Sequence, residues 1–173
     1  MTATADLRHP VSLLVEALVA ALLADDAPTK ALCGSRVYLL PDDTVLPEEA
    51  LPPFYGLVVR DGRVPIESAD DQEWVWPIEI GAYQVLEAPT LAARVTGLAP
   101  FSPGSRAGLL DLVWAANRTI RGRGLGAKYG RFRLVGESAT GVVISGDSSE
   151  ASVLVRRALK FEFEVGVAFT PLT

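Results

Sequence analysis

The segment KFEFEVGVAF, residues 160–169, constrains the fold more than any other part of the chain. Apolar side chains alternate there with charged or small ones, and the apolar positions are Phe161, Phe163, Val165, Val167 and Phe169. A period of two is that of a β-strand, whose successive side chains point to opposite faces of a sheet. The pattern therefore predicts a strand with one face in the core and the other face in water.

Two other segments have the period of a helix. Apolar residues recur at spacings of three and four over residues 11–22, which predicts a helix over residues 10–24 with Pro10 in its first turn. The first apolar run contains Glu16 and is too short to span a bilayer, so we interpret it as a soluble helix rather than a signal peptide. A second helix is expected over residues 107–120. Its apolar stripe consists of Leu109, Val113, Ala116 and Ile120.

The remaining elements are expected to be strands and loops. Strands are predicted at residues 36–40, 54–60, 74–85, 132–135 and 140–145, before the long final strand. Asp61 and Gly62 predict a tight turn back after the second strand, and Pro77 indicates an edge, a bulge or a break in the third. Long loops are expected at residues 41–53, 88–107 and 121–131. The order predicts an α+β fold: one domain, residues 1–173, with two main helices on one face of a largely antiparallel (mixed) sheet.

Groups suited to catalysis or to metal binding are scarce. The chain has one histidine, His9, and one cysteine, Cys33, so a nucleophile has no obvious histidine base and zinc lacks its usual four ligands. The acid pairs Asp42-Asp43, Glu48-Glu49 and Asp70-Asp71 lack the spacing of a calcium loop. We therefore expect no enzyme activity, no cofactor and no metal.

The stretch RGRGLGAKYGRFR, residues 121–133, is rich in glycine and in bases. It is not a phosphate-binding loop, because Tyr129 follows Lys128 where a Ser or Thr is required, and because the stretch leaves a helix and enters a strand. The bases in and before it are Arg118, Arg121, Arg123, Lys128, Arg131 and Arg133. These bases could bind the phosphates of nucleic acid, but a protein with a net charge of −5 is a poor general nucleic-acid binder. We therefore expect the partner of the basic stretch to be an acidic protein surface. Alternatively, Arg118 and Arg121 simply complement the dipole at the end of a helix.

The two halves of the chain differ in charge. Residues 1–90 hold 15 acids and 5 bases, whereas residues 91–173 hold 6 acids and 11 bases. Opposite patches can steer copies of one subunit together and fix their register. An uneven solvated surface would give the same count.

The order of the segments resembles the tail terminator (tail completion) proteins of tailed bacteriophages, the lambda-like family. The segments that carry this resemblance are LLVEALVAALLAD, GSRVYLLP, LPPFYGLVVRDG, IEIGAYQV, GLLDLVWAANRTIRG and VRRALKFEFEVGVAF. The chain departs from the shorter members of the family in its three long loops.

The resemblance implies a structural protein of the virion. Such a protein forms a homohexameric ring at the head-proximal end of the tail tube, ends tube polymerisation and docks to the head–neck connector. It implies assembly in the host cytoplasm, a lumen through which DNA passes without specific binding, and no contact with a membrane. The expected subunit or partner contacts are the six bases named above together with Asp42, Asp43, Glu48 and Glu49. Two alternatives stay open: another neck or tail ring protein, such as a head-closure or tube protein, and a small carboxylate-based enzyme.

Overall fold

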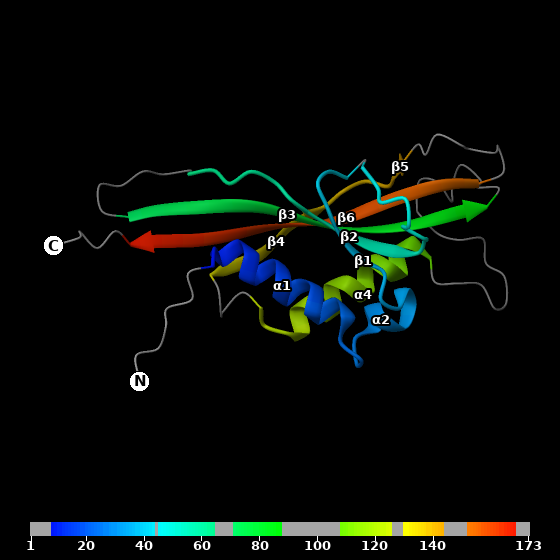
Figure 1. Ribbon diagram of the computed structural model, residues 1–173, viewed down its shortest axis with the longest axis horizontal. Helices are drawn as coiled ribbons and strands as arrows, with labels where there is room; N and C mark the ends of the chain where they lie inside the picture. Colours follow the sequence, from blue (N-terminus) through cyan, green and yellow to red (C-terminus); the bar gives the residue numbers. More distant parts are fainter. Residues whose placement is uncertain are drawn as a thin grey trace.

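Two long strands form the centre of the structure, a computed structural model in which helices cover one face of a single sheet (Figure 1). Residues are described over the ranges 8–43, 45–64, 71–87, 108–125, 130–143 and 152–168. The alternating C-terminal segment forms β6, Ser152–Ala168, which pairs antiparallel along its whole length with β3, Asp71–Glu87. The predicted long strand is confirmed, although Phe169 lies outside the described residues.

The sheet has the order β1-β2-β3-β6-β4, and short β5 also pairs with β6. The outer strands are β1 Val37–Leu40, β2 Phe54–Val59, β4 Arg131–Glu137 and β5 Gly141–Val143. All pairs are antiparallel except β1 with β2, which is parallel. The predicted α+β class, with a mostly antiparallel mixed sheet and two main helices packed on it, is confirmed.

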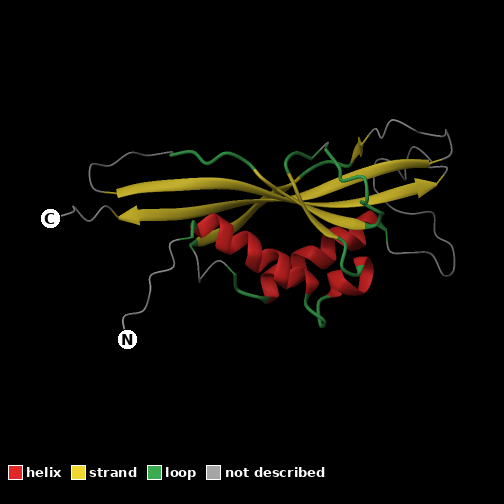
Figure 2. Ribbon diagram, in the orientation of Figure 1, coloured by secondary structure: helices red, strands yellow, loops and turns green. Residues whose placement is uncertain are grey.

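Three helices lie together on one face of the sheet (Figure 2). They are α1 Pro10–Leu23, α2 Pro28–Cys33 and α4 Leu109–Gly122. The ring of His9 caps α1 by accepting a hydrogen bond from the Val11 amide, and Asp111 caps α4 by accepting one from the Gly108 amide. The short helix α2 was not predicted, because six residues are too few to display a helical period.

The apolar stripes of α1 and α4 meet the inner face of the sheet, as the helical spacing predicted. Leu14, Leu18 and Leu22 of α1 are fully buried against this face. The Tyr55 hydroxyl of β2 donates to the Leu112 carbonyl of α4 across the same interface, at 2.8 Å. Burial of this face supplies the main hydrophobic contribution to folding.

Two details around β3 differ from the expectation. The prediction of a tight turn at Asp61 and Gly62 is wrong. The chain instead continues alongside β3, with Val59 opposite Ile78 and Arg63 opposite Val75. Pro77 does not break the strand, because it lies just where the ladder with β2 ends. There the Pro77 carbonyl accepts a hydrogen bond from the Arg60 amide at 2.9 Å. Because proline has no N–H, only the reciprocal hydrogen bond to the Arg60 carbonyl is missing.

The expectation of a wet outer face is also wrong for part of β6. The side chains of Glu162 and Glu164 are only 18% and 10% exposed, although they point away from the helices. Arg131 and Arg133 of β4, together with Arg63, lie over these two acids as ion-pair partners. A buried acid is tolerated in a sheet when such partners cover it.

Candidate assembly surfaces

The structure divides the predicted basic surface into three parts. Arg131 and Arg133 of β4 pair with Glu164 and Glu162 of β6, at 3.4 and 2.8 Å. Arg123, which follows α4, pairs with Asp26 near the end of α1. These three charges are therefore neutralised within the subunit, and Lys128 lies outside the described residues.

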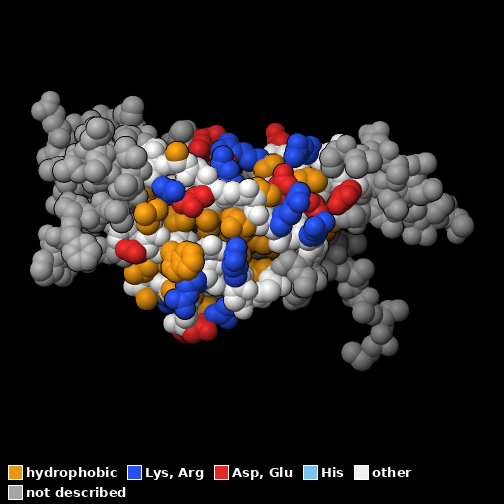
Figure 3. Space-filling view, turned by 180° about the vertical axis from the view of Figure 1, so that it is seen from behind, with side chains coloured by type: hydrophobic (Ala, Val, Ile, Leu, Met, Phe, Trp, Pro, Cys, Tyr) orange, Lys and Arg blue, Asp and Glu red, His pale blue; other side chains and the backbone are white. Residues whose placement is uncertain are grey.

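Arg118 and Arg121 form the third part, on the outer side of α4. Both are exposed, and neither forms an ion pair with any residue that the structure describes. Trp114 precedes Arg118 by one helical turn, and its side chain is 63% exposed. We call Trp114, Arg118 and Arg121 the α4 ridge. Figure 3, which views the molecule from behind, shows exposed hydrophobic side chains bordered by Lys and Arg.

The predicted acidic contacts separate in the same way. Asp42 and Asp43 follow β1 and pair with arginines of the sheet. Glu48 and Glu49 are exposed and have no ion-pair partner among the described residues. Val45 and Leu51, which flank them in the chain, are also exposed. We call Val45, Glu48, Glu49 and Leu51 the acidic loop.

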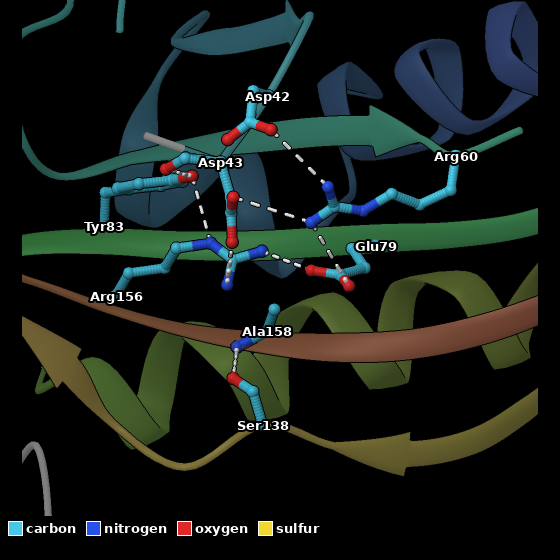
Figure 4. Close-up of polar contacts among 8 residues, drawn as sticks. All are labelled: Asp42, Asp43, Arg60, Glu79, Tyr83, Ser138, Arg156 and Ala158. Atoms are coloured by element: carbon cyan, nitrogen blue, oxygen red, sulfur yellow. Dashed lines mark hydrogen bonds and ion pairs between the residues drawn. The ribbon is translucent and has the colours of Figure 1, made fainter. Parts of the chain in front are cut away.

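A partly buried ion cluster fixes the start of this loop to the outer face of the sheet (Figure 4). At its centre is Arg156 of β6, which reaches Glu79 at 2.6 Å, Asp43 at 3.3 Å and the Tyr83 hydroxyl at 3.0 Å. Tyr83 in turn donates to the Asp43 carbonyl at 3.1 Å. We call Arg156, Glu79, Tyr83, Asp43 and Arg60 the arginine clamp.

Arg60 completes the clamp from the end of β2. Its guanidinium lies 3.5 Å from Asp42, 3.5 Å from Asp43 and 3.7 Å from Glu79. Gly81 leaves the space that the clamp needs, since a Cβ there would lie 2.9 Å from the Tyr83 ring and 3.0 Å from Arg156 Nε. The clamp thus sets two arginines against the carboxylates of Asp43 and Glu79, and Asp42 adds a third carboxylate beside Arg60.

Electrostatics within the clamp favour its ionised form. Burial disfavours the charged guanidinium of Arg156, but the bond with Glu79 and the nearby Tyr83 and Asp43 outweigh it and raise the pKa of Arg156. For Tyr83, burial raises the pKa of the hydroxyl, and this effect is larger than the lowering by the nearby Arg156. Tyr83 therefore stays a neutral hydrogen-bond donor near neutral pH.

No sequence pattern singled out Arg156, Glu79, Arg60 or Tyr83 as members of a site. Their one sequence signal is a charge or hydroxyl inside an otherwise apolar strand, as for Glu79 within WPIEIGAY. Such a signal says that a partner is required, because a buried charge is paired or very costly. It does not say which residue the partner is.

Metal-ligating side chains are not gathered in the part of the chain that the structure describes. No group of three or more His, Cys, Asp or Glu could hold a metal ion there. Cys33 is fully buried, and burial raises the pKa of its thiol to about 11. No described helix is long and apolar enough to cross a membrane.

One apolar pocket opens beside the start of α1. Its volume is about 290 Å³, and its lining consists of His9, Pro10, Trp74, Trp76 and Val165. None of these residues is an acid. The only ionisable one among them, His9, already accepts a hydrogen bond from the Val11 amide at the helix cap. The pocket therefore offers no carboxylate for general acid or base chemistry.

Comparisons with known proteins add no assignment. No protein-family model matches the chain, and a search of curated proteins found no match.

Proposed function

We propose that this chain is a structural protein of a tailed-bacteriophage virion, a tail terminator that forms a homohexameric ring at the head-proximal end of the tail tube. One observation carries the proposal: two exposed patches of opposite charge, each with exposed apolar side chains, have no ion-pair partner within the described subunit. A subunit of a ring needs two such complementary surfaces, because each copy meets its two neighbours through different sides.

The resemblance to tail terminator proteins supports the particular place in the virion. The segments that carry it form helix, strands, helix and strands in the expected order. In this role the partners are other copies of the chain, the tail tube protein and the head–neck connector proteins. The ring ends tube polymerisation, and its lumen lets DNA pass without specific binding.

Electron microscopy of the full chain mixed with purified tail tubes tests this role. The expected result is a closed ring at one end of each tube, and tubes so capped no longer elongate when tube subunits are added. Uncapped tubes, which keep elongating under the same conditions, are the control. The protein would be assembled in the host cytoplasm and retained in the virion.

The alternatives give different images. A tube protein adds to the tube and lengthens it, and a head-closure protein forms a ring that leaves elongation unchanged. A small carboxylate-based enzyme stays monomeric and does not bind the tube. A monomer bound away from the tail axis, or a two-fold dimer, contradicts the proposal.

A further inference from the structure

We propose that the α4 ridge of one copy binds the acidic loop of the next, so that these two patches form the contact between subunits. This inference rests on the proposed ring, and it names the residues that hold the ring together. Two observations support it: the charges of both patches have no ion-pair partner among the described residues, and the two patches lie on different layers.

The α4 ridge has the composition of an interface centre. The core side of α4 is complete without Trp114, because Leu112, Val113, Ala115 and Ala116 are already buried there. Trp114 nevertheless places a large apolar side chain in water, with Arg118 and Arg121 one and two turns further along the helix. Tryptophan and arginine are the residues that most often dominate binding energy at protein interfaces.

The two arginines of the ridge differ from most others in the described chain. Arg60, Arg63, Arg123, Arg131, Arg133, Arg156 and Arg157 all hold ion pairs within the subunit. Arg36 instead donates to backbone carbonyls. The charges of Arg118 and Arg121 are therefore available to an acidic partner.

The acidic loop offers the complementary surface. Glu48 and Glu49 have no ion-pair partner among the described residues, and Leu51, 67% exposed, adds an apolar side chain for Trp114 to contact. Asp61 and Glu73 are other exposed acids, but neither lies in the chain beside one of the large exposed hydrophobic residues. The loop thus matches the ridge in both charge and apolar content.

The loop is held in place before it binds. The arginine clamp fixes its start, and Arg36 donates to the Leu51 carbonyl at 3.3 Å near its end. Between these points Leu46 and Ala50 pack against a small core formed by Leu40, Phe54, Val58 and Tyr83. A fixed loop loses less conformational entropy on binding than a mobile one.

The positions of the two patches favour a head-to-tail contact. The ridge belongs to α4 in the helical layer, whereas the chain between β1 and β2 passes over the opposite face of the sheet (Figure 1). There Leu46 and Ala50 pack against the small core of Leu40, Phe54, Val58 and Tyr83. One neighbouring copy cannot easily reach both layers at once. Each copy then binds one neighbour through its ridge and another through its loop, and such a head-to-tail contact builds a ring when its rotation closes.

Charge reversal on each side provides the test. Arg118→Glu with Arg121→Glu places acids against the acidic loop, and Glu48→Arg with Glu49→Arg places bases against the ridge. Each full-length double variant should lose self-association at least about tenfold in sedimentation velocity, as two reversed contacts at an interface imply. Asp61→Arg with Glu73→Arg makes the same charge change as the loop variant elsewhere, and it should associate like the wild type.

Mixing the two variants is the decisive arm. The reversed ridge of one matches the reversed loop of the other, and their unchanged patches also match. An equimolar mixture should therefore regain rings in which the two variants alternate, although neither assembles alone. Trp114→Ser, at an exposed position, should fold normally and weaken association by about tenfold or more.

The outcomes separate this inference from the proposed function. If the wild type caps tail tubes as a ring and the double variants do the same, the function stands and this contact is wrong. If the variants self-associate normally but no longer bind the tubes, the ridge or loop binds the tube protein instead, and the inference is again overturned. If the wild type stays monomeric both alone and with tail tubes, the ring and the contact both fail.

Discussion

Replacing Arg156 by methionine should destabilise the protein, because it removes the central cation of the arginine clamp. Methionine keeps most of the volume of the side chain and none of its charge. The substitution breaks the ion pairs with Glu79 and Asp43, and it removes the donor to the Tyr83 hydroxyl. Glu79, whose side chain is 15% exposed, is left with the more distant Arg60.

The size of the effect follows from how much charge stays uncompensated. Removing one partner of a fully buried ion pair costs about 3–5 kcal/mol of unfolding free energy. Here Arg60 remains 3.7 Å from Glu79 and 3.5 Å from Asp43, and Asp43 is partly exposed. We therefore expect a smaller loss, about 2–3 kcal/mol.

Arg63→Met is the matched control. Arg63 also pairs with an acid of the sheet, Glu162, but its own side chain is 66% exposed. An exposed pair contributes about 1 kcal/mol or less. The same charge is lost in both variants, so the difference between them measures the burial of Arg156 together with its additional contacts.

Urea unfolding of the wild type and both variants measures these losses. In the double variant Arg156→Met with Glu79→Gln, a neutral amide replaces the acid that would otherwise lack a close partner. The double variant should therefore lose less unfolding free energy than the sum of the losses of the two single variants. The loop should also be cut faster by proteases in Arg156→Met, because the clamp fixes residues 42 and 43. If Arg156→Met costs no more than Arg63→Met, the clamp does not stabilise the fold and the reasoning is refuted.

Three further outcomes are expected. A thiol reagent at pH 8 should label Cys33 only as fast as the protein unfolds, since the thiol is buried and its pKa is raised to about 11; rapid labelling of the native protein would contradict this. Tyr55→Phe should lower the unfolding free energy by about 1 kcal/mol in urea titrations, because the bond to the Leu112 carbonyl is lost; an unchanged midpoint and slope would show that this bond contributes nothing. Arg123→Glu should leave self-association in sedimentation unchanged, because Arg123 is paired with Asp26; a loss as large as that from reversing the α4 ridge would contradict our division of the bases.

The fold could be predicted from the sequence wherever a single period persisted over many residues. The alternation in β6 and the stripe of α1 each repeat several times, so each specifies one element and one buried face. Short features failed because their meaning depends on neighbouring strands. Asp61 and Gly62 are a frequent turn signal, yet here pairing with β3 keeps the chain extended through Arg63.

The site could be predicted in part, for a related reason. Sequence composition identifies which residues are charged, but only the strand register identifies their partners. Arg156 lies opposite Tyr83 in the ladder between β3 and β6, and Glu79 comes four residues before Tyr83 on β3. A shift of that ladder by one residue would turn Arg156 to the other face and destroy the clamp.

The same reasoning changes the meaning of the charge difference between the two halves of the chain. Part of that difference is compensated inside the subunit: Arg123 pairs with Asp26, and Arg156 pairs with Asp43 and Glu79, in each case between a base of the second half and acids of the first. The imbalance therefore partly reflects how the two halves fold onto each other, and by itself it does not indicate self-association. Among the described residues, the α4 ridge on one layer and the acidic loop on the other combine charges that have no ion-pair partner with large exposed apolar side chains. A few localised charges can fix the register of a contact, whereas its strength must come from apolar side chains such as those of Trp114 and Leu51.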